Sequence, residues 1–330
     1  MDRRGRLVSE QHFEFVRTNG VTLRVATAGD GPLVVLVHGF PESWYSWRHQ
    51  IKALSEAGYR VAAPDVRGYG GSDRPEPIEA YDMESLTGDI AGLAEALSPG
   101  EEAVVVGHDW GAPIAWNTAR LHTDRFRAVA GLSVPYLPMG EVVFIDMVHE
   151  VFTKRGLFFY QVYFQDVGPP EAELEADPAA TIRRFYYAVS GDAPDGTWPT
   201  DKKHGDTLLH RLPEPEMPLP WLNAEDVAYY DIQFRQSGFR GPLNRYRNHH
   251  RDHAFLKNHP ANPVIQQPSL FVGGTKDLVL KMFQGDIVAA MKPNLADLRG
   301  CHLLEGCGHW TQQERPDEVN RYLIDWLGNL

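Results

Sequence analysis

With 330 residues, of which 43% are hydrophobic and 23% charged, the chain is long enough for one large domain or for a core domain with an insertion. Its formal net charge of -12 argues against nucleic acid and anionic membrane surfaces as partners. Because no apolar run reaches the roughly 20 residues of a membrane span, no signal peptide is visible, and only two cysteines occur, we expect a cytoplasmic protein with free thiols.

Outside its middle third, the sequence alternates short apolar runs with amphipathic segments. The apolar runs predict strands at 13–16, 21–28, 33–37, 59–64, from 103, at 127–134, 268–274 and 297–304. The amphipathic segments predict helices at 44–57, 83–97, 113–121 and 315–327. Because the strands and helices alternate, the sequence predicts an α/β fold in which helices cover both faces of a parallel sheet.

The middle of the chain differs in composition and in hydrophobic pattern. From about 135 to 255 the strand-like runs disappear and aromatic residues multiply, and 190–220 is rich in proline, glycine and charge. We expect a mostly helical insertion that forms a lid over the sheet. The predicted organisation is a first core segment at 1–135, the lid at 136–255 and a second core segment at 256–330.

The stretch from Val104 to Ala112 predicts a nucleophile elbow, a sharp turn from a strand into a helix. At Gly107 and Gly111, a β-carbon would collide with the neighbouring backbone of such a turn. The residue between them, Asp109, is ionised near neutral pH and forms an ester when it displaces a leaving group at an sp³ carbon. This residue favours epoxide opening or dehalogenation over amide or ester hydrolysis, although Gly-x-Asp-x-Gly alone fits a helix cap equally well.

A nucleophile of this kind needs a base, an acid that orients the base, and an oxyanion site. Asp277 and His309 follow the last two predicted strands, in the order nucleophile, acid, histidine that elbow hydrolases use. We expect His309 to accept a proton from the water that attacks the ester, and Asp277 to orient His309. The backbone N–H groups of Phe40 and Trp110 are the expected oxyanion hole, and Pro41 is a candidate for a cis peptide bond.

Epoxide opening also needs a proton donor for the departing oxygen. A tyrosine hydroxyl can supply that proton, whereas halide release requires none. The chemistry alone leaves seven lid tyrosines as candidates: Tyr160, Tyr163, Tyr186, Tyr187, Tyr229, Tyr230 and Tyr246.

Three core motifs and two lid segments together carry a resemblance to a known family. They are His38-Gly39-Phe40-Pro41-Glu42-Ser43-Trp44, Gly107-His108-Asp109-Trp110-Gly111, Gly308-His309-Trp310, and the lid segments 160–165 and 237–247. The set resembles the soluble epoxide hydrolases of the α/β-hydrolase superfamily, in their shorter bacterial form of one domain plus a lid. This resemblance implies a hydrolase that acts on ether bonds and converts a lipophilic epoxide to a vicinal diol with water, without cofactor or metal.

By position, the resemblance matches Tyr160 and Tyr246 to the paired epoxide-activating tyrosines of that family. An apolar substrate pocket is expected, and its assigned positions are His38, Phe40, Trp110, Gln161, Val279 and Trp310. One departure is Ala112, where many relatives carry a second glycine. Aryl, terpene and fatty-acid epoxides all remain open as substrates, and a homodimer is compatible with the sequence.

Two alternatives remain open, a haloalkane or haloacid dehalogenase of the same fold and a catalytically silent ligand-binding protein. Phe40 and the lid tyrosine segments count against the first, and the complete catalytic set counts against the second. An esterase is disfavoured by the aspartate at the elbow. The histidine-rich run 249–253 lacks the spacing of a metal site, so we interpret it as a structural or solvated helix face.

Overall fold

The computed structural model describes residues 11–259, 263–283 and 285–330. Within these residues, the strands of the sheet are β1 (His12–Thr18), β2 (Val21–Ala28), β3 (Leu33–Val37), β4 (Arg60–Pro64), β5 (Ala103–His108), β6 (Phe126–Leu132), β7 (Ile265–Gly274) and β8 (Leu295–Leu304). Their order is β1-β2-β4-β3-β5-β6-β7-β8. β2 pairs antiparallel with β1 and β4, and all other neighbours are parallel. This mostly parallel sheet confirms the predicted fold class.

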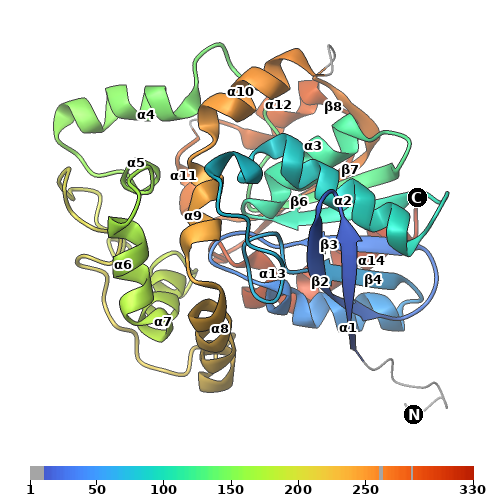
Figure 1. The fold of residues 1–330 in the computed structure, drawn as a ribbon, viewed down its shortest axis with the longest axis horizontal. Coiled ribbons are helices and arrows are strands. Elements are labelled where there is room, and N and C mark those ends of the chain that lie inside the picture. The colour runs from blue at the N-terminus through green and yellow to red at the C-terminus, as the bar shows by residue number, and fades with distance from the viewer. Residues whose placement is uncertain (1–10, 260–262, 284) are drawn as a thin grey trace.

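Helices cover both faces of the sheet (Figure 1). One apolar cluster joins side chains of α2 (Met83–Leu97) and α3 (Gly111–Leu121) to one face, and a second joins α1 (Arg48–Glu56) and α14 (Pro316–Leu327) to the other. The residues of a strand alternate between these two clusters. In β3, Val35 and Val37 belong to the first, and Val34 and Leu36 to the second. Because both faces are buried, the central strands are apolar along their whole length.

The segment between β6 and β7 forms a mostly helical layer beside the sheet, seen at the left of Figure 1. Its helices are α4 (Phe144–Val151), α5 (Tyr160–Tyr163), α6 (Pro169–Ala176), α7 (Pro178–Ala188), α8 (Ala224–Ser237), α9 (Arg240–Tyr246) and α10 (His249–Asn258). We refer to this segment as the lid. α10 returns to the core, where it packs against α2.

Several element boundaries differ from the sequence-based prediction. The segment predicted as one helix over 44–57 begins as a 3₁₀ turn, Trp44–Trp47, which Ser43 caps by accepting a hydrogen bond from the Tyr45 N–H. α1 then follows as a regular helix. β7 begins at Ile265, earlier than predicted, and its register with β8 shifts between Ile265 and Pro268. The pairing is irregular there because proline has no N–H to donate.

Further short helices were not predicted from the sequence. They are α11 (Leu278–Lys281), α12 (Ile287–Met291), α13 (Thr311–Glu314) and the 3₁₀ helices Ile78–Tyr81, Thr153–Arg155 and Lys292–Asn294. Both cysteines are free thiols, as expected. None of the helices in the described part of the chain has the length and apolar character needed to cross a membrane.

Candidate active site

Asp109 stands at the turn between β5 and α3. Its backbone has a φ of 49°, in the left-handed region that side chains other than glycine rarely occupy. The flanking glycines leave no room for a side chain, since a β-carbon on Gly107 would meet the Gly111 carbonyl and one on Gly111 would meet the Val37 carbonyl. A β-carbon on Gly39 would meet the Asp109 carboxylate itself. The turn is therefore built around the aspartate, at the N-terminus of α3.

The Asp109 carboxylate contacts both the loop after β3 and the loop after β8. Its Oδ1 accepts a hydrogen bond from the Phe40 N–H at 2.8 Å, and its Oδ2 lies 3.2 Å from His309 Nε2. The other nitrogen of this histidine, Nδ1, lies 3.0 Å from both carboxylate oxygens of Asp277. Asp277 Oδ1 also accepts a hydrogen bond from the Val279 N–H at 2.8 Å. Three residues named from the sequence, Asp109, His309 and Asp277, thus form one hydrogen-bonded chain.

In this hydrogen-bonded series, the imidazole of His309 lies between two carboxylates, those of Asp109 and Asp277. Burial alone would raise the pKa of Asp109, but the hydrogen bond and charge of His309 outweigh burial and hold that pKa below its ordinary value. Burial would likewise lower the pKa of His309, but the charges and hydrogen bonds of Asp277 and Asp109 raise it well above its ordinary value. The resting site therefore contains an ionised Asp109 beside an imidazolium.

A second buried pair, absent from the sequence-based set, supports this site from behind. Glu42 and His108 are fully buried, and Glu42 Oε2 lies 2.8 Å from His108 Nδ1 and accepts a hydrogen bond from the Gly39 N–H at 2.8 Å. His108 Nε2 lies 2.8 Å from the His309 carbonyl oxygen, so this nitrogen carries a proton and donates it. The pair connects the loop that carries Phe40 to the loop that carries His309. The sequence offered one signal for this pair, because Glu42 and His108 each lie inside a motif that carries the family resemblance.

Tyr160 and Tyr246 lie in the same cavity as Asp109 and His309. Tyr160 begins α5 and Tyr246 ends α9, and their ring centroids are 6.1 Å apart at an interplanar angle of 80°. Burial, followed by the charge of Asp109, raises the pKa of both hydroxyls, so both hold their protons near neutral pH. The other five tyrosines named above do not line this cavity.

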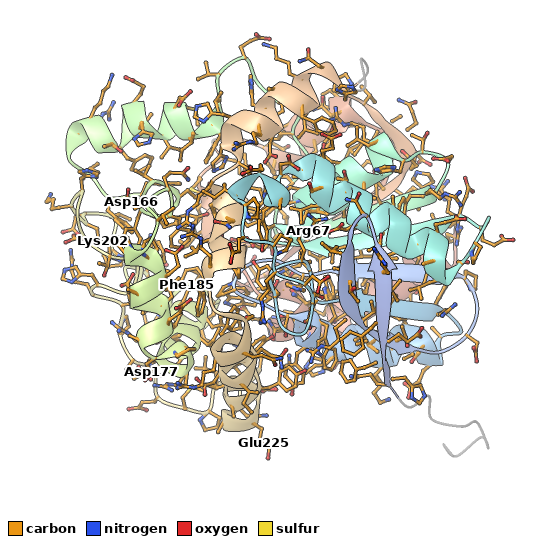
Figure 2. The ribbon with its side chains drawn as sticks, in the orientation of Figure 1. Arg67, Asp166, Asp177, Phe185, Lys202 and Glu225 are labelled. Atoms are coloured by element: carbon orange, nitrogen blue, oxygen red, sulfur yellow. The ribbon has the colours of Figure 1, made fainter. Side chains whose placement is uncertain are left out.

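The cavity has a volume of about 360 Å³ and is mostly apolar. Its lining includes Phe152, Phe158, Phe159, Phe185, Val189, Trp198, Leu278 and Met282. Phe185, labelled in Figure 2, comes from α7, so the lid contributes a large part of the wall. Such a wall suits a lipophilic ligand.

The predicted pocket positions divide into two groups. Phe40 and Val279 lie in the cavity lining, whereas the other four side chains lie outside it. Gln161 donates a hydrogen bond to Tyr160 Oη at 2.8 Å, and the ring of Trp110 packs edge-on against Tyr246, with centroids 5.3 Å apart.

His38 and Trp310 are almost completely buried, and both hydrogen-bond to backbone. The Val66 N–H donates to His38 Nε2 at 3.0 Å, and Trp310 Nε1 donates to the Tyr186 carbonyl at 2.9 Å. In this structure the side chains of His38, Trp110, Gln161 and Trp310 do not line the cavity. They support the loops and the tyrosines behind the wall, because their side chains are taken up by those contacts.

The histidines of 249–253 are used in contacts within the lid and with the core. His249 packs against the ring of Trp110, His250 Nε2 lies 3.1 Å from Asp146 Oδ1, and His253 Nε2 lies 2.9 Å from the Gly140 carbonyl oxygen. Phe40-Pro41 and Met217-Pro218 are cis peptide bonds, and the first settles the isomer that the sequence left open at Pro41.

Comparison with known proteins agrees with this geometry. A family model described as alpha/beta hydrolase fold matches residues 32–316. Epoxide hydrolase A of Mycobacterium tuberculosis is 45% identical over 324 residues, which cover 96% of this chain and 97% of that relative. Bifunctional epoxide hydrolase 2 of Sus scrofa is 40% identical over 310 residues, which cover 93% of this chain and 53% of that relative.

Among solved structures, the crystal structure of Epoxide Hydrolase A from Mycobacterium thermoresistibile superposes with a TM-score of 0.90 at 45% sequence identity. The match covers 96% of this chain and 98% of that chain. The likeness therefore extends over both the sheet and the lid. By its sequence, its fold and the arrangement of its site, this chain belongs to the α/β-hydrolase fold family and, within that family, to the epoxide hydrolases.

Proposed function

We propose that this protein hydrolyses a lipophilic epoxide to a vicinal diol through a covalent ester on Asp109. The observation that carries the proposal is one apolar cavity that holds the carboxylate of Asp109, the hydroxyls of Tyr160 and Tyr246, and His309 paired with the carboxylate of Asp277. This set supplies a nucleophile, a proton donor for the leaving oxygen and a general base.

The first step is ring opening. An Asp109 oxygen attacks one epoxide carbon, and the bond from that carbon to the ring oxygen breaks. The ring oxygen keeps the bonding electrons and takes a proton from Tyr160 or Tyr246. The product is an ester of Asp109 that carries a neighbouring hydroxyl group, together with a tyrosinate. Asp109 is suited to this attack because its lowered pKa keeps it ionised.

The second step is hydrolysis of the ester. Esterification removes the negative charge of Asp109, which is one of the groups that raise the pKa of His309. The pKa of His309 therefore falls, the imidazolium releases its proton to solvent, and the neutral histidine can then accept a proton from the water that attacks the Asp109 carbonyl carbon. The alkyl oxygen leaves with that proton. When Asp109 ionises again, its proton restores the tyrosine, and His309 takes up a proton from solvent to become the imidazolium again. The sum is epoxide plus water to diol.

The negative oxygen of the hydrolytic intermediate needs donors. The Phe40 N–H already donates to Asp109 Oδ1 at 2.8 Å, so it is in place before the reaction starts. We assign the Trp110 N–H, at the N-terminus of α3, as its partner donor. Each acts through its backbone, so replacing either side chain is expected to change the pocket more than the oxyanion hole.

A single turnover in ¹⁸O-water, with enzyme in excess over styrene oxide, limonene oxide or 9,10-epoxystearate, tests the proposal. Because the ester is cleaved at the Asp109 carbonyl, we expect ¹⁸O in Asp109 and unlabelled oxygen in the first diol formed. His309→Gln should accumulate the ester as a mass increase on the peptide that contains Asp109, and Asp109→Asn should form none.

Two outcomes would contradict the proposal. Label found in the first diol and absent from Asp109 would mean that water attacks the epoxide directly. Halide release from haloalkanes, with all three epoxides left unchanged, would favour the dehalogenase alternative instead.

A further inference from the structure

Gln165 follows α5 and hydrogen-bonds to both lid segments that carry the active-site tyrosines. Its side-chain Nε2 donates to the carbonyl oxygen of Gln161 at 2.8 Å and to that of Tyr246 at 2.8 Å. A primary amide has two N–H donors, and both are used in these two bonds. One side chain therefore joins α5 to the end of α9, although Gln165 and Tyr246 are 81 positions apart in the sequence.

Both carbonyls need a donor from outside their own helix. The last carbonyl groups of a helix have no intrahelical partner, and the backbone N–H of Gln165 donates to Val162, not to Gln161. At the end of α9, no backbone N–H of the described residues donates to the Tyr246 carbonyl. α5 has four residues, too few to be stable without such contacts. Gln165 therefore supplies donors that the backbone lacks.

The two bonded carbonyls lie next to the reacting hydroxyls in the chain. One belongs to Tyr246 itself, and the other belongs to Gln161, whose own side chain donates to Tyr160 Oη at 2.8 Å. The ring of Phe164 packs against both tyrosines, with its centroid 5.7 Å from that of Tyr160 and 5.0 Å from that of Tyr246. Fixing the backbone at both tyrosines fixes the spacing and direction of their hydroxyl groups.

We propose that Gln165 is a positioning residue for ring opening, which holds Tyr160 and Tyr246 at the spacing needed for both hydroxyls to reach one epoxide oxygen. This inference rests on the proposed function, because it concerns the step that uses the tyrosines. Ester hydrolysis uses Asp277, His309 and the oxyanion hole, which belong to the core. Loss of the two bonds should therefore slow formation of the ester and leave its breakdown unchanged.

The test is single-turnover kinetics of Gln165→Leu, a change that keeps the approximate size and removes both donors. With the epoxide of the above panel that the wild type converts fastest, rapid quenching and mass spectrometry follow the rise and decay of the ester. We expect the rate of ester formation to fall about 10- to 100-fold, the loss typical of a misplacement near 1 Å, and the rate of ester hydrolysis to stay within about twofold of the wild type.

A double-mutant cycle separates positioning from general damage. If Gln165 acts through the tyrosines, Gln165→Leu should cost less in a Tyr246→Phe background than in the wild type. Gln236→Leu is the matched control, because Gln236 is an exposed lid residue near the end of α8. Gln165→Met replaces Gln165→Leu if the latter fails to fold, as judged by circular dichroism.

Each outcome decides the inference. Unchanged ester formation in a folded Gln165 variant overturns it, as do equal losses in both steps or fully additive losses in the cycle. If the wild-type protein forms no Asp109 ester, the proposed function fails first, and the inference fails with it. If the wild type forms the ester and the Gln165 variant forms it at the wild-type rate, only the positioning role is rejected, and the proposed function stands.

Discussion

Asp109 and His309 each stabilise the charged form of the other. The pKa of Asp109 is lowered and that of His309 is raised, so the ion pair exists between these two values. Its contribution to stability is complete below the ordinary histidine pKa of about 6.5 and is lost as the pH rises through the raised value of His309. At the acid end, it is present above the ordinary aspartate pKa of about 3.9 and is lost as the pH falls through the lowered value of Asp109.

The mechanism requires the pKa of His309 to fall when Asp109 becomes neutral. Asp109→Asn places a neutral amide where the ester carbonyl would be, so we expect the midpoint of His309 titration to move down in this variant. NMR titration of the His309 imidazole in the wild type and in Asp109→Asn measures the difference. An unchanged midpoint would mean that Asp277 alone sets the pKa of His309, and esterification would then not release the base.

Asp109, Asp277 and His309 could be predicted because their chemistry and chain order are visible in the sequence, whereas Tyr160 and Tyr246 came only from the family resemblance. A carboxylate between two glycines fits a helix cap as well as a nucleophile, and the order of Asp277 and His309 after later strands favours the nucleophile. Glu42 and His108 were missed because complete burial and mutual contact are properties of the folded chain. Gln165 lies in one of the lid segments that carry the resemblance, but one of its two hydrogen bonds is to a residue 81 positions away.

At the scale of elements, the strand–turn–helix formed by β5 and α3 sets the position of the nucleophile. Gly107 and Gly111 approach each other so closely that a β-carbon on Gly107 would meet the Gly111 carbonyl. The clash is with backbone, which cannot rotate away as a side chain can. The elbow therefore depends on glycine for space, whereas Asp109 itself accepts a strained φ of 49°.

Gly107→Ala should lower the free energy of unfolding by about 3 kcal/mol or more, since the added methyl group has to displace backbone. Gly140→Ala is the matched control, because apart from its chain neighbours no atom of the described residues lies within 4 Å of the added β-carbon. It should change that free energy by no more than about 1 kcal/mol. Urea unfolding followed by tryptophan fluorescence measures both. Equal effects of the two changes would show that the elbow tolerates a side chain at 107.

The strands were easier to predict than the lid helices for a physical reason. Each central strand is buried on both faces, so it appears as a continuous apolar run. A lid helix packs against other lid helices and the cavity, and α5 consists of only four residues, Tyr160–Tyr163. Such a short helix is too short to show a hydrophobic periodicity, and it is stabilised by its tertiary contacts.

For the whole molecule, the relation between lid and core is fixed by buried polar contacts. Asp226 in α8 is 4% exposed, accepts a hydrogen bond from Tyr45 Oη at 2.9 Å and lies 3.3 Å from Arg48 Nε. Burial, followed by the charge of Asp226, raises the pKa of Tyr45 to about 12, so this hydroxyl remains a donor. Asp226 also accepts from the Asn223 N–H at 2.8 Å, which caps α8. One carboxylate thus starts a lid helix and attaches it to the core.

Asp226→Asn keeps the shape of this contact and removes its charge. We expect it to lower the free energy of unfolding by about 1.5–3 kcal/mol, the usual value of hydrogen bonds to a charged group, and to speed proteolysis within the lid. Asp231→Asn on the same helix breaks only the exposed pair with Arg235, whose side chain is 57% exposed, and should cost no more than about 0.5 kcal/mol. Thermal unfolding and limited proteolysis of both variants give the comparison. If Asp226→Asn is no more sensitive than Asp231→Asn, the lid is held to the core by its apolar contacts, and the polar attachment is dispensable.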